Sequence, residues 1–158
     1  MLNETDLLHR LASYCSQSER CVMDVRKKIQ AENISKEVEQ DLIDKLVSER
    51  FIDERRFARS FVHDKFHFHR WGLVKINYEL KMRGIQSDIC REAIETTIDD
   101  DEYLTVLTDL LRAKKRTVKG RSQQDVYQKL FRFATAKGFE HAFIIQILKK
   151  MFKNIADD

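Results

Sequence analysis

Basic and aromatic side chains alternate through the stretch Lys65–Arg83, KFHFHRWGLVKINYELKMR. Lys and Arg neutralise phosphates or meet acidic protein patches, and aromatic rings stack on bases or anchor protein interfaces. The only Trp of the chain, Trp71, stands beside Gly72 and is either a binding anchor or a packing residue. The stretch predicts a surface for a polyanionic or protein partner, and its candidate contacts are Lys65, Arg70, Trp71, Lys75, Lys81 and Arg83.

Two further groups of cations are candidates for the same kind of contact. In the segment FIDERRFARSFV, the apolar positions Phe57, Ala58, Phe61 and Val62 define a buried side, so that the arginines project mostly from the other side. The alternative is a solvated basic face, since most exposed charges only solubilise. The second group lies in a predicted basic loop, Lys114–Arg121. The two sets are Arg55, Arg56 and Arg59, and Lys114, Lys115, Arg116, Lys119 and Arg121.

No residue pattern predicts catalysis, a metal or a cofactor. His63 and His67 would approach each other on a helix, but neither they nor His69 has a Cys or an acidic ligand set beside them in the sequence. The chain has no P-loop, no G-x-S-x-G and no Gly-rich dinucleotide fingerprint. Three consecutive acids, Asp99–Asp101, point in different directions and are better explained as charges at a helix N-terminus. We therefore expect a non-enzymatic protein without a cofactor.

Charge is strongly segregated although the net charge is only +3. Residues 1–54 carry 8 basic and 12 acidic side chains, and residues 55–83 carry 8 and 2. Residues 84–112 carry 2 and 8, and residues 113–158 carry 11 and 4. A protein that coats nucleic acid uniformly would be basic throughout, whereas this pattern suits a partner that presents both signs, such as a protein–nucleic acid complex.

The cysteines and the N-terminal sequence bear on the compartment. Cys15, Cys21 and Cys90 are odd in number and form no C-x-x-C pair, which indicates reduced thiols in a cytosolic protein. The start, MLNETDLLHR, lacks the features of a signal peptide, and no apolar run approaches the length of a membrane span. We expect a cytoplasmic protein.

One pattern recurs three times, at Val25–Ser35, Ile76–Gln86 and Leu130–Glu140. Each copy has an apolar residue, a second four residues later, then Asn or Gly followed by an apolar residue. The offsets are 51 and 54 residues, a period that signals stacked modules rather than one globular core. An array of this kind offers a long surface for an extended partner.

Each module is predicted to contain three helices, because apolar residues recur at helical spacing and the chain has no Pro. Ser35, Asp53 and Ser87 are predicted to cap helices, and Gly84 and Asn33 to end them in a left-handed turn. The predicted fold is all-α, with three tandem three-helix repeats in an elongated, curved array. The expected boundaries are 1–52, 53–99 and 100–158.

The middle module resembles the RecX recombination regulators of bacteria. The family pattern is Phe-Ile-Asp-Asp, then Arg-Phe-Ala and Ser-Phe-Val, a basic stretch, a Gly, and Glu-Leu before a Lys-Gly-Ile turn. The corresponding residues here are Phe51–Glu54, Arg56–Ala58, Ser60–Val62, Gly72, Glu79–Leu80 and Arg83–Ile85, in which Glu54 and Arg83 are conservative departures.

The resemblance implies a regulator that binds the RecA recombinase in the helical groove of its nucleoprotein filament. It implies inhibition of RecA ATPase, strand-exchange and co-protease activities in DNA repair and the SOS response, without an active site. Single- or double-stranded DNA is a further expected partner, and we expect a monomer with no membrane contact. The alternative is a helical module that binds DNA without RecA, since pairs of helices recur around the turns.

Overall fold

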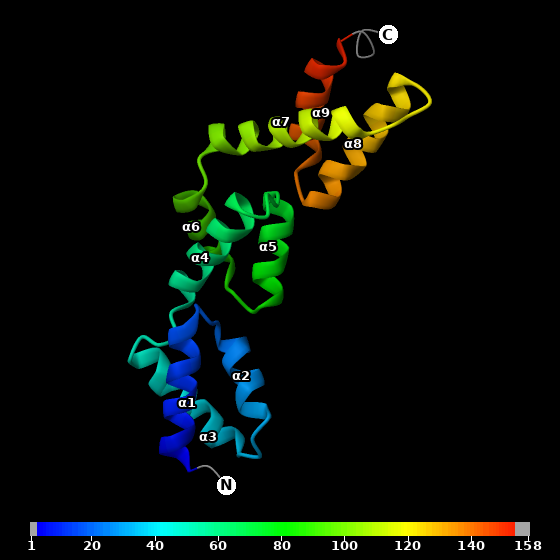
Figure 1. The fold of residues 1–158 in the computed structure, drawn as a ribbon. Coiled ribbons are helices and arrows are strands. Elements are labelled where there is room, and N and C mark those ends of the chain that lie inside the picture. The colour runs from blue at the N-terminus through cyan, green and yellow to red at the C-terminus, as the bar shows by residue number, and fades with distance from the viewer. Residues whose placement is uncertain (1–2, 154–158) are drawn as a thin grey trace. The chain divides into compact units, whose positions relative to one another are not determined.

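The computed structural model describes residues 3–153, which form nine α-helices and no strand (Figure 1). The all-α fold predicted from the sequence is therefore confirmed over this range. None of the helices in it is both long and apolar enough to span a bilayer. The helices are α1 (Glu4–Gln17), α2 (Val22–Gln30), α3 (Lys36–Ser48), α4 (Glu54–His67), α5 (Leu73–Met82), α6 (Ser87–Thr97), α7 (Asp100–Thr117), α8 (Gln123–Lys137) and α9 (His141–Met151).

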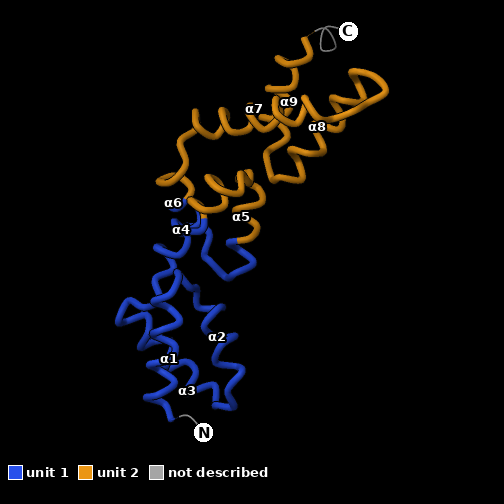
Figure 2. Tube along the Cα trace, in the orientation of Figure 1, with its two compact units in different colours: residues 1–61, 80–93 blue, residues 62–79, 94–158 orange. Residues whose placement is uncertain are grey.

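The chain divides into two compact units, which Figure 2 colours separately. Unit 1 comprises residues 1–61 and 80–93, and unit 2 comprises residues 62–79 and 94–158. Both units take residues from α4, α5 and α6, the helices of the predicted middle repeat. The division into three repeats at residues 52 and 99 stays a prediction.

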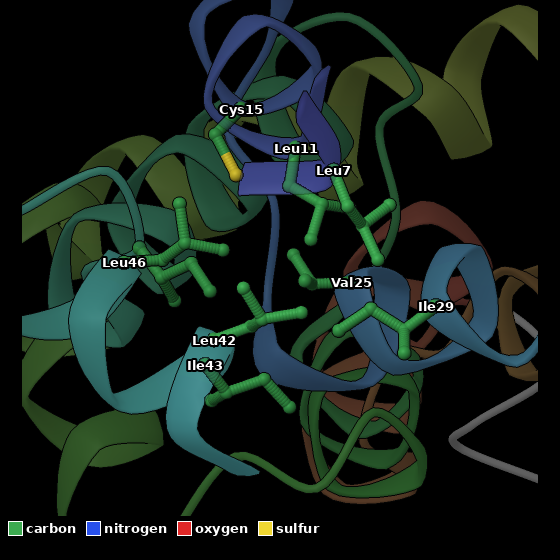
Figure 3. Packing of buried hydrophobic residues seen from close by; sticks show 9 residues of the cluster. Leu7, Leu11, Cys15, Val25, Ile29, Leu42, Ile43 and Leu46 are labelled. Carbon is green, nitrogen blue, oxygen red and sulfur yellow. The ribbon is translucent and has the colours of Figure 1, made fainter. Parts of the chain in front are cut away.

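The core of unit 1 is built from one apolar face of each of its first three helices (Figure 3). Leu7, Leu11 and Cys15 are spaced four residues apart on α1, so they share one side of that helix. They point towards α2 and α3, whose apolar side chains close the cluster. Burying each large aliphatic side chain contributes about 1.5–3 kcal/mol. The contributions of α2 and α3 are Val25, Ile29, Leu42, Ile43 and Leu46.

Two glycines end helices in the same way, as the repeat predicts. Gly84 and Gly138 have φ of 79° and 99°, the left-handed region that a residue without Cβ adopts cheaply. The N–H of Gly84 donates to Lys81 O at 2.9 Å and that of Ile85 donates to Leu80 O at 3.1 Å. In the same way, 54 residues later, the N–H of Gly138 donates to Thr135 O and that of Phe139 donates to Ala134 O. Both α5 and α8 therefore end in a Schellman motif.

The predicted caps at Ser35 and Asp53 are confirmed. The hydroxyl of Ser35 accepts from the N–H of Val38 at 3.2 Å, and Asp53 Oδ1 accepts from the N–H of Arg56 at 3.1 Å. Side-chain oxygens at these positions satisfy N–H groups that have no partner within the helix.

Three local predictions are wrong. Asn33 is not left-handed, because α2 already ends at Gln30 and Ala31 continues in the right-handed region. Ser87 lies inside α6, since the first helical bond of Cys90 reaches Gln86 O at 3.0 Å. The stretch Lys114–Arg121 is not all loop, because α7 continues to Thr117. No Gly or Pro ends the helix earlier, and the partial negative charge at its C-terminus is stabilised by the cations of its last turn.

The N-terminus of α5 is capped by the C-terminal end of α8, within unit 2. The N–H of Gly72 donates to Lys137 O at 2.8 Å, and the N–H of Val74 donates to Gly138 O at 2.9 Å. The orphan donors of one helix thus meet the orphan acceptors of another, with opposite dipole ends facing. A Cβ on Gly72 would lie 2.3 Å from the Gly138 backbone, so only glycine allows this approach.

Tyr103 completes the same junction from α7. Its hydroxyl accepts from the N–H of Leu73 at 2.9 Å and donates to Glu140 Oε1. The ring is buried between Phe66 and Phe139, with centroid distances of 5.8 and 5.2 Å. Burial raises the pKa of Tyr103, and the hydrogen bond to Glu140 adds to the effect, so the hydroxyl stays a donor at all ordinary pH.

We expect Gly84→Val to lower the free energy of unfolding by about 1–2 kcal/mol, because a β-branched residue would be forced into left-handed backbone. The added Cβ would clash with nothing, since its nearest neighbour is Met23 Cε at 3.9 Å. Asn33→Val is the matched control: the repeat gives it the same register, but its φ is not positive. Equal melting temperatures for the two variants would contradict this account.

Tyr103→Phe should cost about 1–3 kcal/mol, because it leaves the half-buried Leu73 N–H without an acceptor and Glu140 without its donor. Chemical denaturation measures the loss, and hydrogen exchange should show faster exchange at Leu73. Tyr127→Phe is the control, since the Tyr127 ring packs on Phe152 and its hydroxyl makes no hydrogen bond within residues 3–153. A loss no larger for Tyr103 than for Tyr127 would rule out the capping role.

Candidate functional site

Cations surround Trp71 where the chain enters α5. Lys75 Nζ lies 4.3 Å and Lys65 Nζ lies 4.8 Å from the centroid of a Trp71 ring. Lys137, from the end of α8, donates to His69 O at 2.9 Å in the loop just before Trp71. We call Lys65, Arg70, Trp71, Lys75 and Lys137 the Trp71 cluster; all five belong to unit 2.

The positive charges of Lys137, Lys75 and Arg70 in this cluster repel one another. Burial lowers the pKa of Lys137, and the nearby charges of Lys75 and Arg70 lower it further. Within residues 3–153, no carboxylate is among the groups that shift the pKa of Lys137. A bound anion would relieve this repulsion, so the electrostatics favour a phosphate or carboxylate at this place.

Arg70 is held in a strained backbone conformation. Its φ is 54°, and the following N–H, that of Trp71, donates to Lys65 O at 2.9 Å. Left-handed backbone costs a residue with a Cβ about 1–2 kcal/mol. The only other positive φ outside glycine in residues 3–153 is that of Arg50, at 64°. Strain of this kind often accompanies functional positions, and here it turns the chain so that Trp71 meets the lysines.

The three arginines of α4 are engaged within unit 1. Both Arg55 and Arg59 pair with Glu92, the latter at 2.8 Å between Nη2 and Oε1. Arg55 also lies 3.7 Å from Asp88, and Arg56 pairs with Glu19. The hydrogen bond from Arg59 holds the pKa of Glu92 below its ordinary value. These arginines are therefore largely neutralised, although they remain about half exposed.

Lys81 and Arg83 lie at the end of α5, in unit 1. Lys81 is exposed, whereas the Arg83 guanidinium covers the ring of Phe61 at 4.8 Å from its centroid. Because the guanidinium lies flat on an apolar ring, packing accounts for at least part of the role of Arg83.

The second predicted set divides between different faces of unit 2. Lys114 Nζ lies over the ring of Phe133, 5.1 Å from its centroid, while Lys115 and Arg116 line a groove beside α9. The backbone carbonyl of Lys119 accepts a hydrogen bond from Lys129 Nζ at 2.6 Å. The N–H of Arg121 donates to Asp125 Oδ2 at 3.0 Å, and the N–H of Asp125 donates to Ser122 Oγ at 3.1 Å at the start of α8.

Sequence reasoning missed Lys137. It lies 66 residues from Trp71, and only the contact between Gly72 and Gly138 brings it beside the cluster. The one sequence signal for this contact was the pair of glycines, Gly72 and Gly138, because a Cβ on either would occupy the space taken by the opposite segment.

The histidines form no metal site within residues 3–153, where no group of three potential ligands gathers. The rings of His63 and His67 do lie 4.5 Å apart, as their spacing predicts. His67 Nε2, however, lies 2.8 Å from Glu102, and its Nδ1 lies 3.1 Å from His63 O. Both ring nitrogens are thus occupied by protein acceptors.

The residues that resemble the RecX pattern most closely are mainly structural. Ile52 is buried, Asp53 caps α4, and the carboxylate of Glu54 accepts from the N–H of Val22 at 3.4 Å at the start of α2. Burial raises the pKa of Glu54. Phe57, Ala58 and Val62 are buried, whereas Phe51 and Phe61 are half-buried, so most apolar positions of the motif serve packing rather than a contact surface.

Residues 53–94 match the family model described as RecX, second three-helix domain. The chain is similar to proteins named Regulatory protein RecX from several bacteria. It is 28% identical to that of Prosthecochloris aestuarii over 93% of this chain and 94% of the relative. It is 26% identical to that of Lactobacillus johnsonii over 86% of this chain and 50% of the relative, so it spans about half the length of that protein.

Two solved structures share the fold. The crystal structure of RecX from Lactobacillus salivarius has a TM-score of 0.79 at 19% identity and covers 93% of this chain and 95% of its own. A crystal structure of regulatory protein RecX has a TM-score of 0.79 at 22% identity and covers 91% of this chain and 72% of its own. These two likenesses show the shared fold, and the match of the second three-helix domain together with the relatives along the chain confirms the resemblance to the RecX family seen in the motif.

Proposed function

We propose that this protein binds RecA and its nucleoprotein filament and inhibits RecA recombinase, ATPase and co-protease activity during DNA repair and the SOS response. Support comes first from the RecX relatives, which are named regulatory proteins. No catalytic residue enters the proposal: binding energy alone biases RecA between its active and inactive states.

The Trp71 cluster is the single observation that carries the proposal. It combines crowded cations with an aromatic ring, and such a surface suits both protein carboxylates and DNA phosphates. A nucleoprotein filament exposes both kinds of anion side by side. We assign the main contact to this cluster and not to Arg55, Arg56 and Arg59, because those arginines already have carboxylate partners.

The second candidate function is a helical DNA-binding module that acts without RecA. The same cluster favours it, since cations beside an aromatic ring are typical of surfaces that bind single strands. The two functions differ in their response to salt. Binding to naked DNA releases counterions and weakens steeply as salt rises, whereas contacts with a protein partner persist.

Arg70→Gly should weaken inhibition of RecA while leaving the melting temperature unchanged or higher, because it removes a cation of the cluster and relieves left-handed strain. Arg50→Gly is a matched control that removes one charge and relieves the same strain in unit 1. We expect it to inhibit like the parent. Equal inhibition by both variants would remove Arg70 from the contact surface.

A titration of RecA ATPase on single-stranded DNA at two salt concentrations, beside a naked-DNA binding curve, separates the two functions. We expect inhibition to survive at the salt concentration where binding to naked DNA is lost. Inhibition that follows naked-DNA binding at both salt concentrations would instead establish the module that acts on DNA alone.

A further inference from the structure

A second cationic site lies in unit 2, in a groove between α7 and α9. The groove has a volume of about 680 Å³ and lies where these two helices pack against each other. Arg112, Lys115 and Arg116 line it from α7, and Lys150 lines it from α9. No Asp or Glu is among the lining residues. We call it the α7–α9 groove.

The cations of this groove lack the internal partners that neutralise others in the protein. Arg112, Arg116 and Lys150 make no ion pair within residues 3–153, whereas Arg26 pairs with Glu39 and Lys129 pairs with Asp125. On α7, Lys115 and Arg116 lie three and four residues after Arg112, spacings at which like charges on a helix repel. The helix dipoles favour cations at the C-terminal ends of α7 and α9, but they do not require the cations of both helices to line the same groove.

The floor of the groove is aliphatic. Leu104, Ile147 and Met151 supply it, and no aromatic ring is among the lining residues. Ile147 is 7% exposed, so the floor is a firm surface continuous with the core. A nucleic acid strand that binds such a groove would gain phosphate contacts but no stacking of its bases. An acidic peptide would gain from both parts of the groove. Its carboxylates would contact the lining cations, which form the rim, and an apolar side chain would contact the aliphatic floor.

We propose that the α7–α9 groove binds an acidic, amphipathic segment of a protein partner. Arg112 and Arg116 stand one helical turn apart and receive two carboxylates of the segment in forked hydrogen bonds. An apolar side chain between those carboxylates rests on Ile147 and Met151, and methionine adapts to side chains of different shape. This site is separate from the Trp71 cluster, and its function does not require that cluster to bind RecA.

The test uses the full chain and a fluorescent 14-residue peptide of glutamates with leucine at every fourth position. Fluorescence anisotropy measures its affinity, and methyl NMR of Ile147 and Met151 reports where it binds. An all-glutamate peptide of the same length and an oligothymidylate serve as competing probes. We expect the leucine-containing peptide to bind most tightly and to shift both methyl resonances.

Charge reversal of the rim is compared with charge reversal elsewhere in unit 2. Arg112→Glu with Arg116→Glu should weaken peptide binding by at least about tenfold, because attraction becomes repulsion. Lys119→Glu with Lys149→Glu makes the same change in net charge outside the groove and should change affinity less than about twofold. If charge reversal disturbs folding, the pair Arg112→Ala and Arg116→Ala replaces it, with Lys119→Ala and Lys149→Ala as its control.

Three results would overturn the proposal. Equal losses in the two double variants would show attraction to net charge only. Equal affinity for the all-glutamate peptide would remove the role of the floor. Tighter binding of the oligothymidylate with the same dependence on Arg112 and Arg116 would make the groove a nucleic-acid site. None of these results bears on RecA inhibition through the Trp71 cluster, which the variants at Arg70 and Arg50 test.

Discussion

The contact of α8 with the start of α5 is the constraint on which unit 2 depends. Three backbone donors at the start of α5 have no partner in their own helix, and α8 and Tyr103 supply all three acceptors. An unpaired buried donor costs about 1–3 kcal/mol, so the junction is strongly specified. It works only because Gly72 and Gly138 allow the two backbones to approach. The candidate site depends on this contact, because the close approach of Gly72 and Gly138 also brings Lys137 beside the Trp71 cluster.

Electrostatics divide the cations of the protein into two kinds. Arg55, Arg56 and Arg59 of α4 are neutralised by carboxylates of the same unit, and exposed pairs of this sort contribute little to stability. Lys75, Arg70 and Lys137 instead repel one another beside Trp71, and the cations of the α7–α9 groove share it with no carboxylate. Counting charges along the chain does not separate the two kinds, because a neutralised arginine and a crowded lysine contribute equally to the net charge. The separation depends on which carboxylate folding places nearby.

The sequence predicted the elements well, because their signals are local. Apolar spacing gave the helices, and Gly84, Ser35 and Asp53 marked their ends through backbone and side-chain chemistry that acts within four residues. It failed at Asn33, because the repeat conserves the register but not the left-handed turn. The sequence also did not indicate the positive φ at Arg50 and Arg70, because arginine has no intrinsic preference for left-handed backbone. The cluster itself was predicted only in part, because the position of Lys137 is set by tertiary contacts.

The central claim is that the Trp71 cluster contacts the RecA filament, and the single Trp allows a direct test. We would incorporate 5-fluorotryptophan and record the ¹⁹F resonance of Trp71 while adding RecA assembled on single-stranded DNA. At a salt concentration where naked DNA leaves the resonance unchanged, we predict that the filament shifts and broadens it, at protein concentrations that inhibit ATPase. A resonance that stays unchanged while ATPase is inhibited would contradict the account.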